Sequence, residues 1–172
     1  IKAIPIQIPL GKEQGFKGVI DLVNMKAIVY SDDVDKLGVN YSVEEIPAEY
    51  KNDAEKQREK MIEGLAEQID FLTEKFLNGE KISNDEIKKA IREGAIDLKL
   101  VPVMCGSAFK KKGIQPLLDA VCDYLPSPLD RKSLVGTNPY TDEEVTRKPL
   151  PDEHFSALAF KIASDKHGDL TF

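Results

Sequence analysis

The sequence has little cysteine and no cluster of metal-binding residues. Its two cysteines, Cys105 and Cys122, belong to no C-x-x-C motif and have no histidine at a ligand spacing. A zinc site of the finger or ribbon type is therefore excluded, and no metal is expected. Both cysteines lie in apolar runs, which favours two buried thiols over the alternative of a disulfide.

The sequence also lacks a membrane-spanning run and an excess of positive charge. No apolar segment is long enough for a membrane helix, so no membrane partner is expected. Pro5, Gln7 and Pro9 interrupt the first apolar residues, which argues against a signal peptide and favours the cytoplasm. With a net charge of −6, the chain as a whole lacks the excess of positive charge that is typical of nucleic-acid-binding proteins. Hydrophobic residues, at 41%, suffice for a core.

A phosphate-binding loop of the form G-x-x-x-x-G-K-[ST] is missing. The stretch Gly11–Lys17 has the wrong spacing and no following serine or threonine. The run Lys110–Lys112 lies outside any glycine-rich turn and is predicted to be solvated. This chain alone is therefore not expected to hold a triphosphate.

The first third of the chain favours a small antiparallel sheet. Ile4, Ile6 and Ile8 alternate and predict a first strand. Further strands are predicted at Phe16–Val23 and Lys26–Tyr30, followed by a polar loop at Ser31–Asn40.

The middle of the chain predicts two helices. The first begins at Pro47 and ends near Asn78–Gly79. The second begins at a capping box, in which Ser83 and Glu86 satisfy each other's backbone amides, and ends at Gly94. The apolar stripe of the first helix is Met61, Leu65, Ile69, Leu72 and Phe76.

A strand, a loop of small residues and a helix follow. Lys99–Cys105 predicts a strand that is covered on both faces. The loop Gly106–Ala108 comes next, and Gly113 marks the start of a helix that Pro126 ends. The predicted buried stripe of this helix is Leu117, Leu118, Val121, Cys122 and Leu125.

The Gly-Ser-Ala loop admits two interpretations. It follows the carboxyl end of a strand, where ligands bind in open α/β sheets, and a backbone amide there could recognise a purine carbonyl. The alternative is a tight turn of small residues without a ligand.

Four stretches, in order, resemble bacterial elongation factor G. They are IPIQIPLGKEQGFKGVIDLV, IREGAIDLKLVPVMCGSA, GSAFKKKGIQPLLDAVCDYLPSP and FSALAFKIASDKHGDLTF. In that family the first opens an insert called G′ within the GTPase domain, and the second returns from it. The third is the Ser-Ala loop with the last helix, and the fourth opens the β-barrel second domain.

The resemblance implies an α/β fold class and four segments. Residues 1–98 would be the G′ insert, of α+β type with a small antiparallel sheet and long helices. Residues 99–128 would be the last strand, loop and helix of a P-loop GTPase domain. Residues 129–153 would be a linker, and residues 154–172 the first strands of a β-barrel. Ile1 is not a methionine and the last strand stops at Phe172, so the chain is expected to be a piece of a longer protein.

The resemblance also implies a function. The parent would be a ribosome-dependent GTP hydrolase that promotes translocation of tRNA and mRNA. Ser107 and Ala108 would contact the guanine base, with Phe109 beside them, where the family often has leucine. The phosphate loop, the switches, the Asn-Lys-x-Asp motif and the Mg²⁺ ligands would lie upstream of Ile1. The parent would bind GTP or GDP with Mg²⁺, whereas this chain alone is expected to be inactive, with no catalytic residue and no cofactor.

An acidic helix is the second functional candidate. Between Glu44 and Glu93 there are fourteen acidic and nine basic side chains, an excess of five negative charges. Such a run is commonly a solvated face. The resemblance implies a contact with the ribosomal stalk protein, through Glu59, Glu63, Glu67 and Asp70. Contacts with rRNA, tRNA and mRNA would be made only by the full-length protein.

Two alternatives stay open. One is a related translational GTPase, such as a recycling paralogue, an organellar form or a ribosomal protection protein. The other is a free-standing α/β protein-interaction module without a nucleotide role.

Overall fold

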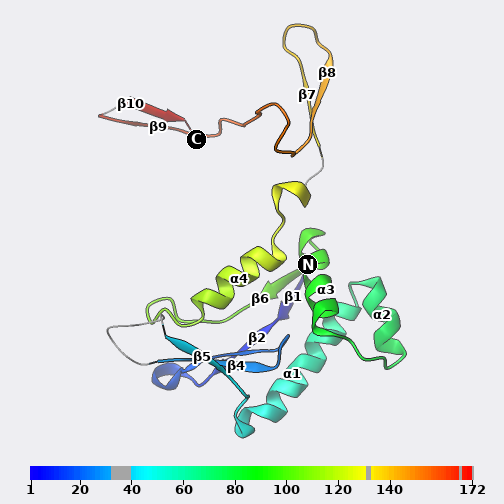
Figure 1. Cartoon of the computed structure of the whole chain (residues 1–172), viewed down its shortest axis with the longest axis vertical. Coiled ribbons are helices and arrows are strands. Elements are labelled where there is room, and N and C mark those ends of the chain that lie inside the picture. Colours follow the sequence, from blue (N-terminus) through cyan, green and yellow to red (C-terminus); the bar gives the residue numbers. More distant parts are fainter. Residues whose placement is uncertain (32–39, 131–132, 167, 172) are drawn as a thin grey trace. The chain divides into compact units, whose positions relative to one another are not determined.

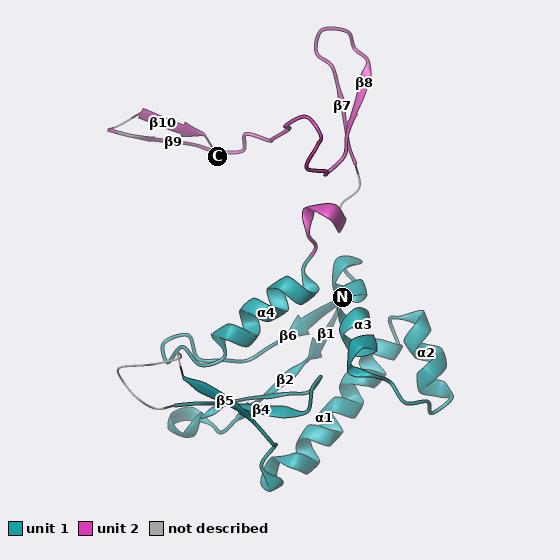
Figure 2. Cartoon of the chain, in the orientation of Figure 1, with its two compact units in different colours: residues 1–125 teal, residues 126–172 magenta. Residues whose placement is uncertain are grey.

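The computed structural model describes residues 1–31, 40–130, 133–166 and 168–171. The chain divides into two compact units, residues 1–125 and 126–172 (Figure 2). The first unit contains the predicted segment 1–98 and most of the predicted segment 99–128, which a parallel strand pair joins. Most of the predicted loop Ser31–Asn40 lies outside the described residues.

The first unit contains two small sheets (Figure 1). Strands β2 (Gln7–Leu10), β3 (Gly18–Asp21), β4 (Lys26–Tyr30) and β5 (Tyr41–Glu44) form an antiparallel sheet in that order. Strands β1 (Lys2–Pro5) and β6 (Leu100–Val103) pair in parallel, with Lys2 opposite Leu100. The mixed α/β character with a small antiparallel sheet agrees with the predicted class.

Ile6 joins the two sheets. Its amide donates to Val103 O at 3.0 Å, and its carbonyl accepts from Leu22 N at 3.1 Å. The predicted single strand through Ile4, Ile6 and Ile8 is therefore two strands, because consecutive backbone groups pair with different neighbours.

Three helices cover the core of this unit. They are α1 (Ala48–Ala66), α2 (Asp70–Leu77) and α3 (Asn84–Ile96). Helix α1 contacts β1, α2 and α3, and α3 contacts β6. Their buried apolar side chains form one cluster with those of the strands, including Met61, Leu65, Ile69, Leu72, Ile87 and Ile91.

The predicted long helix is broken between α1 and α2. Ile69, the N-cap of α2, has extended backbone angles of φ −128° and ψ 107°. The Thr73 hydroxyl donates to Ala66 O at 2.5 Å and so satisfies a carbonyl at the end of α1. The break keeps Ile69 and Leu72 buried but leaves Phe76 38% exposed.

The predicted capping box is confirmed at the start of α3. Ser83 N donates to Glu86 Oε2 at 2.9 Å, and Glu86 N donates to Ser83 Oγ at 3.3 Å. Lys75 also pairs with the Glu86 carboxylate. The Lys75 hydrogen bond and then the two Ser83 groups lower the pKa of Glu86 to about 2. Helix α3 continues past Gly94, where an added Cβ would stand 2.5 Å from Leu100 Cδ2, so this glycine serves close packing rather than termination.

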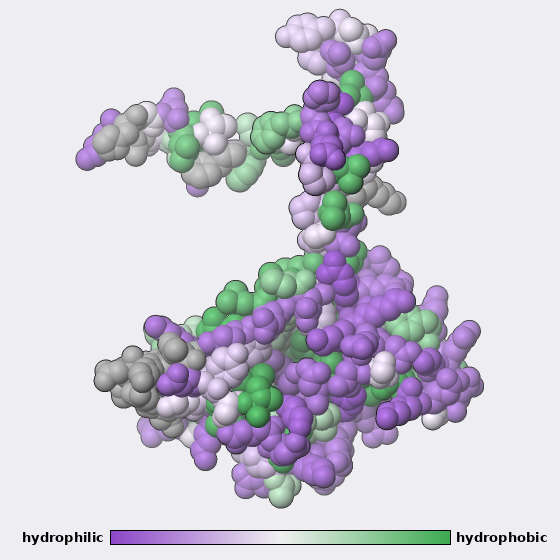
Figure 3. Space-filling model, in the orientation of Figure 1, coloured by the Kyte–Doolittle hydropathy of each residue, from purple (hydrophilic) through white to green (hydrophobic). Residues whose placement is uncertain are grey.

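The apolar stripe of helix α4 (Ile114–Tyr124), which was predicted to be buried, is exposed. Alternate side chains of β6 are exposed to solvent as well. The exposed side chains are Leu117, Leu118, Val121, Leu125, Val101 and Val103. Figure 3 shows hydrophobic surface over α4. The prediction failed because apolar periodicity indicates a face that can be covered, and nothing in the described residues covers this one.

The second unit consists of short elements. They are a 3₁₀ turn at Pro128–Asp130, strands β7 (Leu134–Thr137) and β8 (Glu144–Arg147), and strands β9 (Ile162–Asp165) and β10 (Gly168–Thr171). Each strand pair is an antiparallel hairpin. The segment predicted as a linker therefore contains a hairpin, which its proline and glycine content concealed.

None of the helices in the described residues combines the length and the hydrophobicity that crossing a bilayer requires.

Candidate functional site

The Gly-Ser-Ala loop is a closed turn between β6 and α4. Ser107 and Lys112 form an antiparallel bridge, in which Ser107 N donates to Lys112 O at 2.8 Å and Lys112 N to Ser107 O at 3.1 Å. Lys111 N donates to Ala108 O at 3.0 Å inside the turn. The loop is thus held by its own backbone.

Two glycines allow the ends of the loop to meet. A Cβ on Gly106 would stand 2.8 Å from Lys112 O, and one on Gly113 would stand 3.0 Å from Cys105 O. Gly113 also has φ +88°, which favours glycine. Small residues are therefore required on both sides of the loop.

The loop presents its predicted base-contact residues to solvent. Ala108 is exposed, Phe109 is 100% exposed and Ser107 is half-buried. Within the described part of the chain, the Ala108 amide donates to no backbone carbonyl. The turn can therefore offer one N–H and one aromatic ring to a flat ligand.

Tyr30 fixes the start of α4 beside this loop. Its buried hydroxyl donates to Gln115 Oε1 at 3.0 Å, and its ring lies 5.5 Å from that of Tyr41. Burial raises the pKa of Tyr30, against the lowering effect of a hydrogen bond with the Gly113 backbone. No sequence signal identified this tyrosine, because its partners are far away along the chain.

The three lysines of the loop are not equivalent. Lys110 and Lys111 are exposed, as predicted for a solvated run. Lys112 is only 1% exposed, and its Nζ donates to Phe16 O at 3.0 Å. The prediction was wrong for Lys112, whose side chain turns back into the unit.

A cavity of about 410 Å³ lies between the loop and the β2–β3 turn. The loop contributes Cys105, Gly106, Ser107 and Lys110, and the turn contributes Gly11–Glu13 with Phe16. Two lysines and one glutamate give this cavity a mixed charge.

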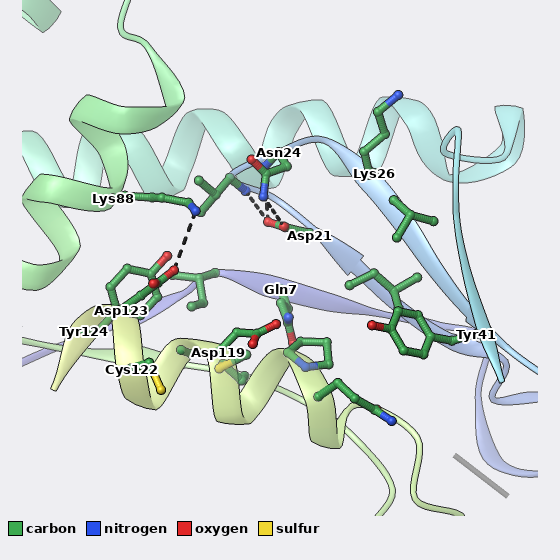
Figure 4. Close-up of a pocket in the computed structure, with 18 residues that line it drawn as sticks. Gln7, Asp21, Asn24, Lys26, Tyr41, Lys88, Asp119, Cys122, Asp123 and Tyr124 are labelled. Carbon is green, nitrogen blue, oxygen red and sulfur yellow. Dashed lines mark hydrogen bonds and ion pairs between the residues drawn. The ribbon is translucent and has the colours of Figure 1, made fainter. Parts of the chain in front are cut away.

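A second cavity, of about 500 Å³, lies between the antiparallel sheet and α4 (Figure 4). Two pairs of its polar residues contact each other. Lys88 lies 3.6 Å from Asp123, and Asp21 accepts hydrogen bonds from Val23 N and Asn24. No sequence signal points to this cavity, since its residues come from six separate elements.

Gln7 and Tyr124 are buried in the wall of this second cavity. Gln7 Oε1 has no hydrogen-bond partner among the described residues. Burial, followed by the charge of Asp123, raises the pKa of Tyr124 to about 12. The tyrosine is therefore protonated throughout the neutral range.

The four acidic residues predicted for partner binding are all exposed. Glu59 and Glu63 project from α1, and Glu67 caps its end and pairs with Lys2. Asp70 stands in the first turn of α2. The four predicted residues thus do not share one continuous helix face, because the helix breaks between Glu67 and Asp70.

The two cysteines differ in environment. Both are free thiols; Cys105 is half-buried and Cys122 is exposed. Burial raises the pKa of Cys105. The prediction of two buried thiols therefore fails for Cys122, which lies on the open side of α4. Among the described residues, no group of three His, Cys, Asp or Glu could hold a metal ion.

Comparison with known proteins shows a shared fold. No protein-family model matches the chain. A crystal structure of a protein from Thermus thermophilus matches 98% of the chain with a TM-score of 0.64 and 24% sequence identity. The chain spans 26% of the length of that protein. At this identity the likeness establishes the fold alone.

Proposed function

We propose that this chain is a segment of a translational GTPase that resembles elongation factor G. Its Ser107–Ala108 loop would contact the guanine base of GTP or GDP. The observation that carries the proposal is the loop itself, a turn closed by backbone hydrogen bonds after the carboxyl end of β6, in which the Ala108 amide donates to no backbone carbonyl among the described residues. Ligands of open α/β sheets bind at such an edge.

The open faces of β6 and α4 support a place in a larger sheet. A strand pair of only β1 and β6 leaves apolar side chains exposed on β6 and along α4. Exposed apolar patches of this kind mark surfaces that meet other protein. Further strands and helices of a P-loop GTPase domain would cover them, and would supply the phosphate loop, the Mg²⁺ ligands and the catalytic groups. The likeness to a much longer protein agrees with this arrangement.

In this proposal the parent hydrolyses GTP on the ribosome in the cytoplasm, with the second unit opening a β-barrel domain. The segment 1–98 corresponds to the G′ insert. A recycling or protection factor of the same class remains the alternative. A free-standing interaction module is a second alternative: it would use the uncovered apolar stripe to bind a partner, but it gives the Ser107–Ala108 loop no role.

The base contact is tested by Ala108→Pro in the protein that includes the neighbouring coding sequence. Proline removes the backbone N–H, so the Kd for fluorescent GDP is expected to rise about tenfold, as for one lost hydrogen bond of about 1.4 kcal/mol. Ala108→Ser keeps the N–H and serves as the control. Equal affinity of both variants and the wild type would remove Ala108 from the site. The 172-residue chain alone is expected to give no fluorescence change at micromolar concentration.

The acidic surface of α1 would contact the ribosomal stalk protein in the same proposal. Negative charge on a helix can steer a basic partner and raise the association rate. The double variant Glu59→Lys, Glu63→Lys is expected to weaken stalk binding roughly tenfold at low salt, with a smaller effect at high salt. Asp152→Lys, an exposed charge reversal in the second unit, is the control. Unchanged affinity of the double variant for the stalk protein would contradict the proposed contact through α1.

A further inference from the structure

Lys112 is a buried charge beside the candidate base-contact loop. It is the only charged residue among those described that is buried, with 1% of its surface exposed. Burying an ammonium group is costly unless it is hydrogen-bonded, and its Nζ donates to Phe16 O at 3.0 Å. This hydrogen bond connects the end of the loop to the β2–β3 turn, where Phe16 lies.

The acceptor of this hydrogen bond lies in a tightly bonded turn. Gly15 N donates to Lys12 O at 2.9 Å, and Lys17 N donates to Leu10 O at 2.8 Å. Gly11, at φ +88°, approaches Gly15 so closely that a Cβ would stand 2.0 Å from Gly15 O. The Phe16 carbonyl is therefore a fixed point between β2 and β3.

The backbone of the same lysine holds the loop. Lys112 exchanges both backbone hydrogen bonds with Ser107, and its carbonyl lies against Gly106. Its side chain thus ties the β2–β3 turn to the residue that closes the Ser107–Lys112 turn. A shift of the β2–β3 turn would be transmitted to Ser107 and Ala108.

We propose that Lys112 is a positioning residue that holds the base-contact loop in place against the antiparallel sheet, and that the position of the β2–β3 turn thereby sets nucleotide affinity. This inference rests on the proposed function for its nucleotide part. The loop-holding part stands on the structure of the chain itself, and the two parts are tested separately.

The loop-holding part is tested by hydrogen exchange of the 172-residue chain. Lys112→Met keeps the apolar stem and removes the ammonium group. The Ser107 and Lys112 amides are expected to exchange at least tenfold faster than in the wild type. Lys111→Met, the same substitution at the exposed neighbour, is expected to stay within threefold. Lys112→Arg keeps a charged donor and is also expected to stay within threefold. The proposal would be overturned if these amides exchanged as fast in Lys112→Arg as in Lys112→Met. It would also be overturned if they exchanged as slowly in Lys112→Met as in the wild type.

The nucleotide part uses the longer protein with its neighbouring coding sequence and fluorescent GDP as the probe. Lys112→Met is expected to raise the Kd about fivefold, whereas Lys111→Met leaves it unchanged. If Ala108→Pro weakens binding and Lys112→Met does not, the positioning role is wrong and the base contact stands. If Ala108→Pro has no effect either, the proposed base contact itself fails.

Discussion

Replacing Gly18 with alanine is expected to lower the free energy of unfolding of this chain by about 3 kcal/mol. An added Cβ would stand 1.9 Å from Ile28 O and 3.3 Å from the Cα of Val29. Both atoms belong to the backbone of β4, so no side-chain rotation can relieve the clash.

The position of Gly18 in the sheet makes this effect large. Gly18 pairs with Leu10 of β2 on one side and with Val29 of β4 on the other. Strand β3 would have to move away from β4, and the pairs at Val19 and Ile20 would be strained in turn. Both of those side chains are fully buried.

A denaturant titration followed by circular dichroism measures this loss. Gly15→Ala is the matched control, because a Cβ there meets nothing within 4 Å. The control is expected to change the free energy of unfolding by no more than about 0.5 kcal/mol. If Gly18→Ala were as stable as the control, the close approach of β3 to β4 would be contradicted.

The truncation Leu65→Ala is expected to cost about 2–5 kcal/mol of stability. Leu65 is fully buried on α1, the helix that contacts β1, α2 and α3. Removing its branched end would leave a cavity where those elements meet, and the lost transfer and packing free energies would add.

Leu77→Ala provides the control for this truncation. Leu77 lies in a helix too, at the end of α2, but is 78% exposed. The same change there is expected to alter stability by no more than about 0.5 kcal/mol. Comparable losses in both variants, measured by thermal and denaturant unfolding, would contradict the assignment of Leu65 to the core.

Local signals predicted the elements that depend on neighbours in sequence. The strand Lys26–Tyr30 and the capping box of Ser83 and Glu86 are confirmed. Both rest on side-chain types and backbone geometry within a few residues, which the sequence displays directly.

Effects of tertiary structure were not predictable in the same way. The break at Ile69 depends on Thr73 reaching back to Ala66 O, and the pattern of buried residues continues across it. The burial of Lys112 depends on Phe16 O, which is 96 residues away in the chain. Neither contact can be predicted from the periodicity of apolar residues in the sequence.

The candidate site was predicted in part. The position of Ser107 and Ala108 after a strand follows from the sequence, but Gly106, Gly113 and Tyr30 were not recognised as the residues that close and hold the loop. The sequence predicts a buried stripe on α4, which is exposed in the structure, because an amphipathic pattern does not say which chain covers it.

The Ala108 amide offers the most direct test of the proposed contact with the guanine base. The protein with its neighbouring coding sequence would be labelled with ¹⁵N-alanine, and GDP would be added while the Ala108 resonance is followed. A saturable shift of that resonance with GDP, and none with ADP, is the predicted result. A protein that binds GDP while the Ala108 amide stays unchanged would contradict the account.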